Sequence, residues 1–145
     1  MIRTINANDK EIFIKMVTEF YNSEAVLHSI PKENIINTFE EITSNSPFTV
    51  GYIVEINSEV AGYILLSFTY SNEAGGLTVL LEEIFVKEEF RGLGLGSKMI
   101  NYTKEKYSNA KRFRLEVEND NVKAINLYKS LGFNFLNYGQ MYFDK

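Results

Sequence analysis

The feature that most constrains the fold of this chain is an apolar, β-prone run that leads through a glycine-rich segment into a helical pattern. The run covers residues 77–86 and is interrupted only by Glu82 and Glu83. Glycines in the following segment, 91–97, allow positive φ and let the backbone approach a ligand closely. The free amides and the dipole at the start of the helix predicted over 97–107 favour an anion such as a phosphate.

The rest of the chain predicts alternating helices and strands. Apolar spacing predicts helices around residues 12–20, 34–44 and 121–131, and strands over 48–56, 60–70, 113–118 and 133–142, the last forming one or two closing strands. Asn57-Ser58 predicts a tight hairpin turn, and residues 22–31 are either a broken helix or a loop. With no repeat or linker, we expect one mixed α/β domain over residues 1–145.

Composition excludes several classes of site and partner. The chain has no Cys and a single His, His28, which excludes thiolate nucleophiles, Cys-ligated metals and His-pair metal motifs. The net charge is −4, so we expect no nucleic-acid partner. No apolar run approaches the roughly 20 residues of a membrane span, and residues 1–6 lack the features of a secretory signal, so we expect no membrane partner and a cytoplasmic location.

Charge is unevenly distributed along the chain. The first 86 residues hold 4 Lys and Arg against 12 Asp and Glu, and the remaining residues hold 11 against 7. An acidic first part and a basic second part suit one cationic and one anionic partner.

Three interpretations of the glycine-rich segment are possible. It can be a turn without a ligand, a dinucleotide-binding loop or a pyrophosphate loop for coenzyme A. The dinucleotide pattern needs Gly or Ala at position 97, where this chain has Ser97, although Glu116 lies 20 residues beyond Gly96. The preceding sequence also predicts helices and antiparallel hairpins rather than a βαβ unit.

Two motifs together resemble the GCN5-related N-acetyltransferases. Arg91-x-x-Gly94-x-Gly96 matches that family's R/Q-x-x-G-x-G/A signature, and Asn121-x-x-Ala124-x-x-Leu127-Tyr128, followed by Gly132-Phe133, matches its downstream signature. Residues 63–100 are most similar to the diamine and spermidine/spermine acetyltransferase branch. The resemblance implies a central mixed, mostly antiparallel sheet flanked by helices, with acetyl-CoA as co-substrate and no metal.

The resemblance also implies the cofactor site. Backbone amides of the glycine loop would hold the pyrophosphate, and the exposed edge of the preceding strand would pair with the pantetheine arm, as a peptide adds to a sheet edge. An amide of Phe85 or Ile84 would polarise the thioester carbonyl. The implied cofactor residues are Ile84, Phe85, Val86, Arg91, Gly92, Leu93, Gly94, Leu95, Gly96, Ser97 and Asn121.

The chemistry of acetyl transfer to an amine suggests roles for three further residues. Tyr128, in the second motif, is the expected acid for the leaving thiolate, because a phenol stays protonated at neutral pH. Consecutive strand residues point to opposite faces, so either one of Glu82 and Glu83 faces a helix layer or a cleft, or both are solvated at an edge of the sheet. In the resembled branch, the residue matching Glu82 is the candidate base, and Glu83 would assist in amine binding.

The predicted activity is therefore transfer of an acetyl group from acetyl-CoA to a primary amine, such as a polyamine or another small cation. Tyr21 and His28 are further candidate acceptor contacts, and we expect a homodimer. Amino acids, aminoglycosides and protein N-termini are alternative acceptors. A non-catalytic acyl-CoA sensor on the same fold and a nucleotide-binding oxidoreductase fragment are alternative functions.

Overall fold

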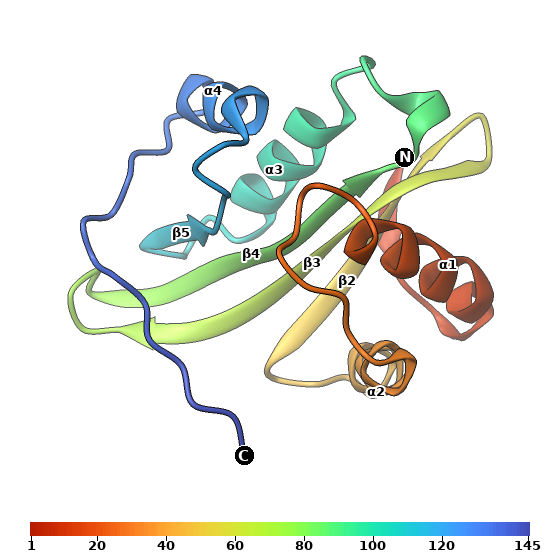
Figure 1. Ribbon diagram of the computed structural model, residues 1–145, viewed down its shortest axis with the longest axis horizontal. Coiled ribbons are helices and arrows are strands. Elements are labelled where there is room, and N and C mark those ends of the chain that lie inside the picture. The colour runs from red at the N-terminus through yellow and green to blue at the C-terminus, as the bar shows by residue number, and fades with distance from the viewer.

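The computed structural model describes residues 1–145 and contains one five-stranded sheet with helices on both faces (Figure 1). The strands, in their order across the sheet, are β1 (Ile2–Thr4), β2 (Thr49–Ile56), β3 (Glu59–Ser71), β4 (Gly76–Val86) and β5 (Arg112–Leu115). Neighbouring strands are antiparallel, except that β4 and β5 run parallel. The predicted mixed α/β fold with a mostly antiparallel sheet is confirmed.

The helices are α1 (Lys10–Tyr21), α2 (Lys32–Thr43), α3 (Leu95–Lys106) and α4 (Val122–Ser130), with 3₁₀ turns at Ala7–Asp9 and Glu88–Phe90. They agree with the predicted helices to within a few residues. The chain between α1 and α2 has no regular structure. The predicted tight turn between β2 and β3 is present, with positive φ at Asn57 (49°) and Ser58 (67°), as a two-residue hairpin requires.

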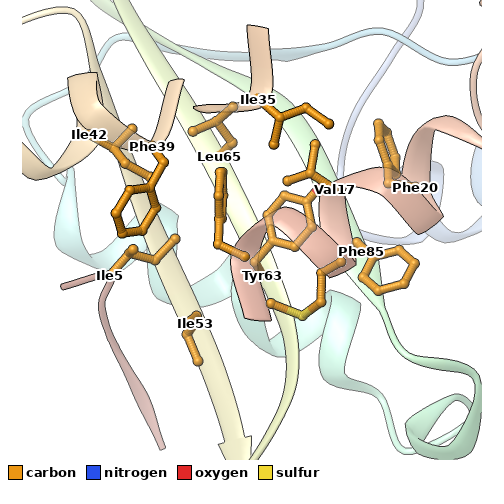
Figure 2. Packing of buried hydrophobic residues seen from close by; sticks show 12 residues of the cluster. Ile5, Val17, Phe20, Ile35, Phe39, Ile42, Ile53, Tyr63, Leu65 and Phe85 are labelled. Carbon is orange, nitrogen blue, oxygen red and sulfur yellow. The ribbon is translucent and has the colours of Figure 1, made fainter. Parts of the chain in front are cut away.

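One hydrophobic core lies between the sheet and helices α1 and α2 (Figure 2). Helix α1 forms because Phe13, Met16, Val17 and Phe20 recur at helical spacing and bury one stripe against the sheet. From the sheet side, Tyr63 is fully buried, and its ring meets that of Phe13 edge-on at 5.6 Å between centroids. This packing fixes the end of α1 over β3 and β4.

A second core lies on the other sheet face, under α3. Alternation along the strands sends the neighbours of the first-core residues to this side, among them Tyr52, Val54 and Ile64. Met99 and Ile100 of α3 are fully buried against them. The sheet is therefore the middle of three layers, and its strand ends are left to build a site.

Strand β1 is a difference from the predicted elements. Three residues carry too little pattern to predict a strand, and long-range contacts hold this one in place. Arg3 donates to both carboxylate oxygens of Asp9, at 2.8 and 2.9 Å, and to Glu55 of β2 at 2.8 Å. The pair lies at the start of α1, so it fixes the N-terminal end of the chain to the sheet.

The strands predicted over residues 133–142 are absent, and this prediction was wrong. The segment alternates in a strand-like way, but a strand forms only where a neighbour takes up its backbone hydrogen bonds, and no strand pairs with it. The segment runs along the surface past β5 and the ends of β3 and β4 (Figure 1), where Tyr138 donates to Glu73. It exposes large apolar side chains, up to 99% at Met141.

Candidate active site

One edge of β4 is free along the second half of the strand. β4 pairs with β3 over its whole length, but with β5 only over residues 78–81. At the free edge, Arg91 Nε donates to the Val86 carbonyl at 3.1 Å, whereas the Lys87 amide donates to β3. Because successive peptide groups point to opposite edges, those of Ile84 and Val86 face the free edge. An extended ligand can add there as a further strand.

The same alternation distinguishes the two amides considered for the thioester carbonyl. The peptide group of Phe85 faces β3, and its ring is buried beside that of Tyr63, with 5.8 Å between centroids. The amide of Ile84 is therefore the one that reaches a ligand lying along the free edge.

The pairing of β3 with β4 is interrupted by a β-bulge at the two glutamates of β4. Leu65 of β3 pairs with Glu83, and Leu66 pairs with Leu81, so Glu82 is the extra residue of β4. Ser67 Oγ donates to Glu82 Oε1 at 2.6 Å.

The bulge places both carboxylates on one face of the sheet. Tyr63 Oη donates to Glu83 Oε2 at 2.7 Å, and Tyr63 and Ser67 lie four residues apart on β3, on one face. The expectation that Glu82 and Glu83 point to opposite faces was therefore wrong, because the bulge breaks the alternation between them. Both lie on the face covered by α1.

Glu83 is a buried carboxylate held by two phenols. Its residue is only 8% exposed, and Tyr21 Oη at the end of α1 donates to its Oε1 at 2.7 Å. Burial raises the pKa of Glu83; the two hydrogen bonds, from Tyr21 and then Tyr63, oppose this, and the charge of Glu82 adds to it. Burial and the hydrogen bond to Glu83 raise the pKa of Tyr21, so this phenol stays a donor.

The glycine-rich segment forms an open backbone loop before α3. Gly92 and Gly94 have φ of 80° and 71°, and nothing lies within 4 Å of where a Cβ would stand at either. No side chain caps α3, and the first amides of a helix have no intrahelical acceptor. The Leu93 side chain is exposed. The loop therefore offers unpaired amides and open space to an anion, which fits a pyrophosphate.

Helix α4 lies beside the start of this loop's helix. A Cβ at Gly96 would stand 3.8 Å from the Leu127 side chain. Asn121 caps α4, and its Oδ1 accepts from the Ala124 amide at 3.2 Å. This contact gives Asn121 a role in starting the helix, in addition to the cofactor role that the resemblance implies.

Tyr128 of α4 has a hydroxyl group without a hydrogen-bond partner in the protein. Burial alone raises its pKa, with no contribution from a charge or a hydrogen bond. Its ring packs against Phe133, with 6.2 Å between centroids, and lines a pocket of about 1010 Å³ bounded by β5, α4 and the C-terminal segment. A phenol of this kind stays protonated at neutral pH and is free to donate to a ligand.

His28 is the one predicted acceptor contact without a described contact to these groups. His28 is exposed in the segment between α1 and α2. Sequence reasoning missed Tyr63 and Ser67, although a serine in an apolar strand was a visible signal for the latter.

No group of three or more His, Cys, Asp or Glu is placed to hold a metal ion, and none of the helices has the length and apolar character of a membrane span.

The chain matches the model of the acetyltransferase (GNAT) family over residues 14–133. It is 33% identical over 141 residues to a mouse thialysine N-epsilon-acetyltransferase, covering 90% of this chain and 82% of the relative. It is 39% identical over 61 residues to a Bacillus subtilis spermine/spermidine N(1)-acetyltransferase, covering 39% and 40%. A solved possible acetyltransferase from Clostridium difficile has the same fold, with a TM-score of 0.85 at 17% identity over 100% of this chain and 97% of that one. A solved AAC(6')-Iy in complex with a bisubstrate analogue also has this fold, with a TM-score of 0.82 at 18% identity over 100% of this chain and 97% of that one.

Proposed function

Since the chain belongs to the GNAT family and is an acetyltransferase, we propose that it transfers the acetyl group of acetyl-CoA to a primary amine of a small cationic molecule. One observation carries the choice of acceptor: the bulge gathers Glu82 and Glu83 on one face, beside the free edge of β4. Two neighbouring carboxylates on one face of the sheet attract an ammonium group. The relatives named for thialysine and for spermine and spermidine support the same class.

The cofactor site would be built mainly from backbone. The free edge of β4 at Ile84 and Val86 would pair with the pantetheine arm, with Phe85 supporting the strand from the core. The amides between Gly92 and Ser97 would donate hydrogen bonds to the pyrophosphate. Arg91 donates only its Nε to the protein, which leaves its other donors for a phosphate.

The catalytic steps need a base, an oxyanion donor and an acid. Glu82, exposed and held by Ser67, would take the proton of the bound ammonium, directly or through water. The neutral nitrogen would then bond to the carbonyl carbon while the Ile84 amide stabilises the oxyanion. When the carbon–sulfur bond breaks, Tyr128 would donate a proton to the thiolate, and the second proton that the nitrogen loses on forming the amide would restore the phenol through water. With no Cys in the chain to carry the acetyl group, direct attack on the thioester is the proposed route.

The acceptor would lie under the segment that follows α1. Glu83, whose Oε1 accepts from Tyr21 at 2.7 Å in the free protein, would contact its charged part. Tyr21 would lie beside that contact, and His28 in the same segment would form an outer wall. The exposed apolar side chains of residues 135–143 support association into a homodimer, because large apolar patches commonly mark protein interfaces. The cytoplasmic location stays a prediction.

An amine panel tests the proposal. The protein is mixed with acetyl-CoA and with diamines, polyamines, lysine analogues, aminoglycosides, neutral amino acids or N-terminal peptides, and free thiol is measured. We expect turnover to be fastest with small dications and to fall at high salt. Fastest turnover with neutral amino acids or peptides would refute the acceptor class, and binding of acetyl-CoA without turnover would indicate a sensor.

A further inference from the structure

Tyr63 lies in the hydrophobic core between the sheet and helices α1 and α2. The residue is fully buried, and its ring centroid lies 5.6, 6.5 and 5.8 Å from those of Phe13, Phe20 and Phe85. Figure 2 shows Tyr63 among the other side chains of this core. The hydroxyl therefore has a position fixed by the core. A phenylalanine would fill the same space without bringing a polar group into the core, where an unpaired one is costly.

The two phenols that hold Glu83 differ in how firmly they are held. Tyr63 reaches Oε2 from the core, whereas Tyr21 reaches Oε1 from the end of α1, where its side chain is only half-buried and the irregular segment begins. Oε2 is thus anchored by a rigid donor, and Oε1 is held by a donor that a ligand can replace.

We infer that Tyr63 is a positioning residue for acetyl transfer: it anchors Oε2 of Glu83 from the core, so that Oε1 is presented to the ammonium of the acceptor. This inference rests on the proposed function, because it assigns Glu83 to acceptor binding. It extends the site to a residue that touches neither substrate. The acceptor ammonium takes the place of the Tyr21 hydroxyl at Oε1, while Tyr63 keeps the carboxylate from turning away.

The charge state of Glu83 follows from the groups that face it. These are Tyr21 from α1, Tyr63 from β3 and Glu82 from β4. The Tyr63 hydrogen bond lowers the pKa of Glu83, against burial and against the charge of Glu82. Without it, the pKa of Glu83 rises, and the carboxylate that binds an ammonium is lost at a higher pH.

The test compares Tyr63→Phe with Tyr52→Phe. Tyr52 is also buried, and its hydroxyl shares a 2.7 Å hydrogen bond with Tyr107, but it belongs to the core under α3. Each substitution removes one buried hydroxyl and one hydrogen bond. Circular dichroism and Tm establish that both variants are folded.

For Tyr63→Phe we expect KM for the amine to rise about tenfold at pH 7, and the acid limb of kcat/KM for the amine to move up by about one pH unit. KM for acetyl-CoA should be unchanged, and Tyr52→Phe should leave both amine parameters unchanged. If both variants give the same amine KM and the same acid limb as the wild type, Tyr63 has only a packing role and the inference is wrong.

A titration of the free protein separates this inference from the proposed function. The side-chain carboxyl carbon of Glu83, labelled with ¹³C, is followed by NMR against pH in the wild type and both variants. We expect a higher pKa of Glu83 in Tyr63→Phe alone. The proposed function fails if the wild type turns over no amine, whereas an unchanged Glu83 titration in Tyr63→Phe overturns the anchoring role whatever the substrate.

Discussion

Replacement of Glu82 by glutamine tests the proposed base. Glutamine keeps the shape of the side chain and can keep an oxygen beside Ser67, whose hydroxyl lies 2.6 Å from Glu82 Oε1, but it cannot take a proton. A primary amine with a pKa of about 10.4 is neutral in only about one molecule in 2,500 at pH 7. The variant must therefore draw on this small neutral fraction, which grows about tenfold with each pH unit up to the amine pKa.

We expect kcat/KM of Glu82→Gln for the amine to lie about 10²–10³-fold below that of the wild type at pH 7, and the gap to close towards pH 10. Thiol release measured from pH 6.5 to 10 checks this, as the two profiles should converge only at alkaline pH. Ser67→Ala is the matched control, because it removes the donor and keeps the carboxylate; its profile should keep the wild-type shape. Parallel profiles of Glu82→Gln and the wild type over the whole range would refute the reasoning.

Three further substitutions give separable results. Tyr128→Phe removes a hydroxyl that has no protein partner, and we expect kcat to fall about 10²-fold or more with little change in acetyl-CoA affinity, as measured by steady-state kinetics and calorimetry; unchanged turnover would exclude Tyr128 as the acid. Gly94→Ala places a side chain on a residue whose φ is 71°, which disfavours this loop conformation by about 1 kcal/mol. Because the loop then adopts the binding conformation less often, acetyl-CoA should bind about fivefold more weakly while the amine KM stays constant. Asp9→Asn should lower stability by about 2 kcal/mol and Tm by about 6 °C, because it removes one of the two ionic partners of Arg3, the other being Glu55. The Arg3 hydrogen bond holds the pKa of Asp9 below its usual value, so the wild type has this stabilisation above the ordinary carboxyl pKa of about 4 and loses it as pH falls through the lowered pKa, whereas the variant should lack that acid-dependent loss in urea titrations.

The elements that could be predicted are those whose signal is local. Helix α1 and the β2–β3 hairpin carry their own periodicity and turn residues, and the glycine loop is visible as a motif. β1 could not be predicted, because Arg3 finds its partners at Asp9 and at Glu55 on another strand. The strands expected over 133–142 show the reverse case, in which a strand-like pattern has no neighbour to pair with.

The candidate site was predictable to the same extent. Glu82, Glu83 and Tyr128 stand out because they depart from an apolar pattern or complete a motif. Their mutual arrangement depends on the register of β3 against β4, and no local pattern shows that a bulge falls at Glu82. Tyr63 was missed for a related reason, since an aromatic residue within an apolar strand has the pattern of the core in which its ring lies.

The unpaired edge of β4 exists because β5 is short. β5 ends at Leu115, which pairs with Leu81, while β4 continues to Val86, so the last part of β4 has no neighbouring strand on that edge. Point substitutions change the side chains around this unpaired edge but leave the edge itself unpaired. Lengthening β5 by a few residues would cover it with a neighbouring strand. If the pantetheine arm pairs with this edge and the acceptor lies at the bulge, as proposed, single substitutions around the bulge would change acceptor preference without changing the main-chain contacts to the thioester.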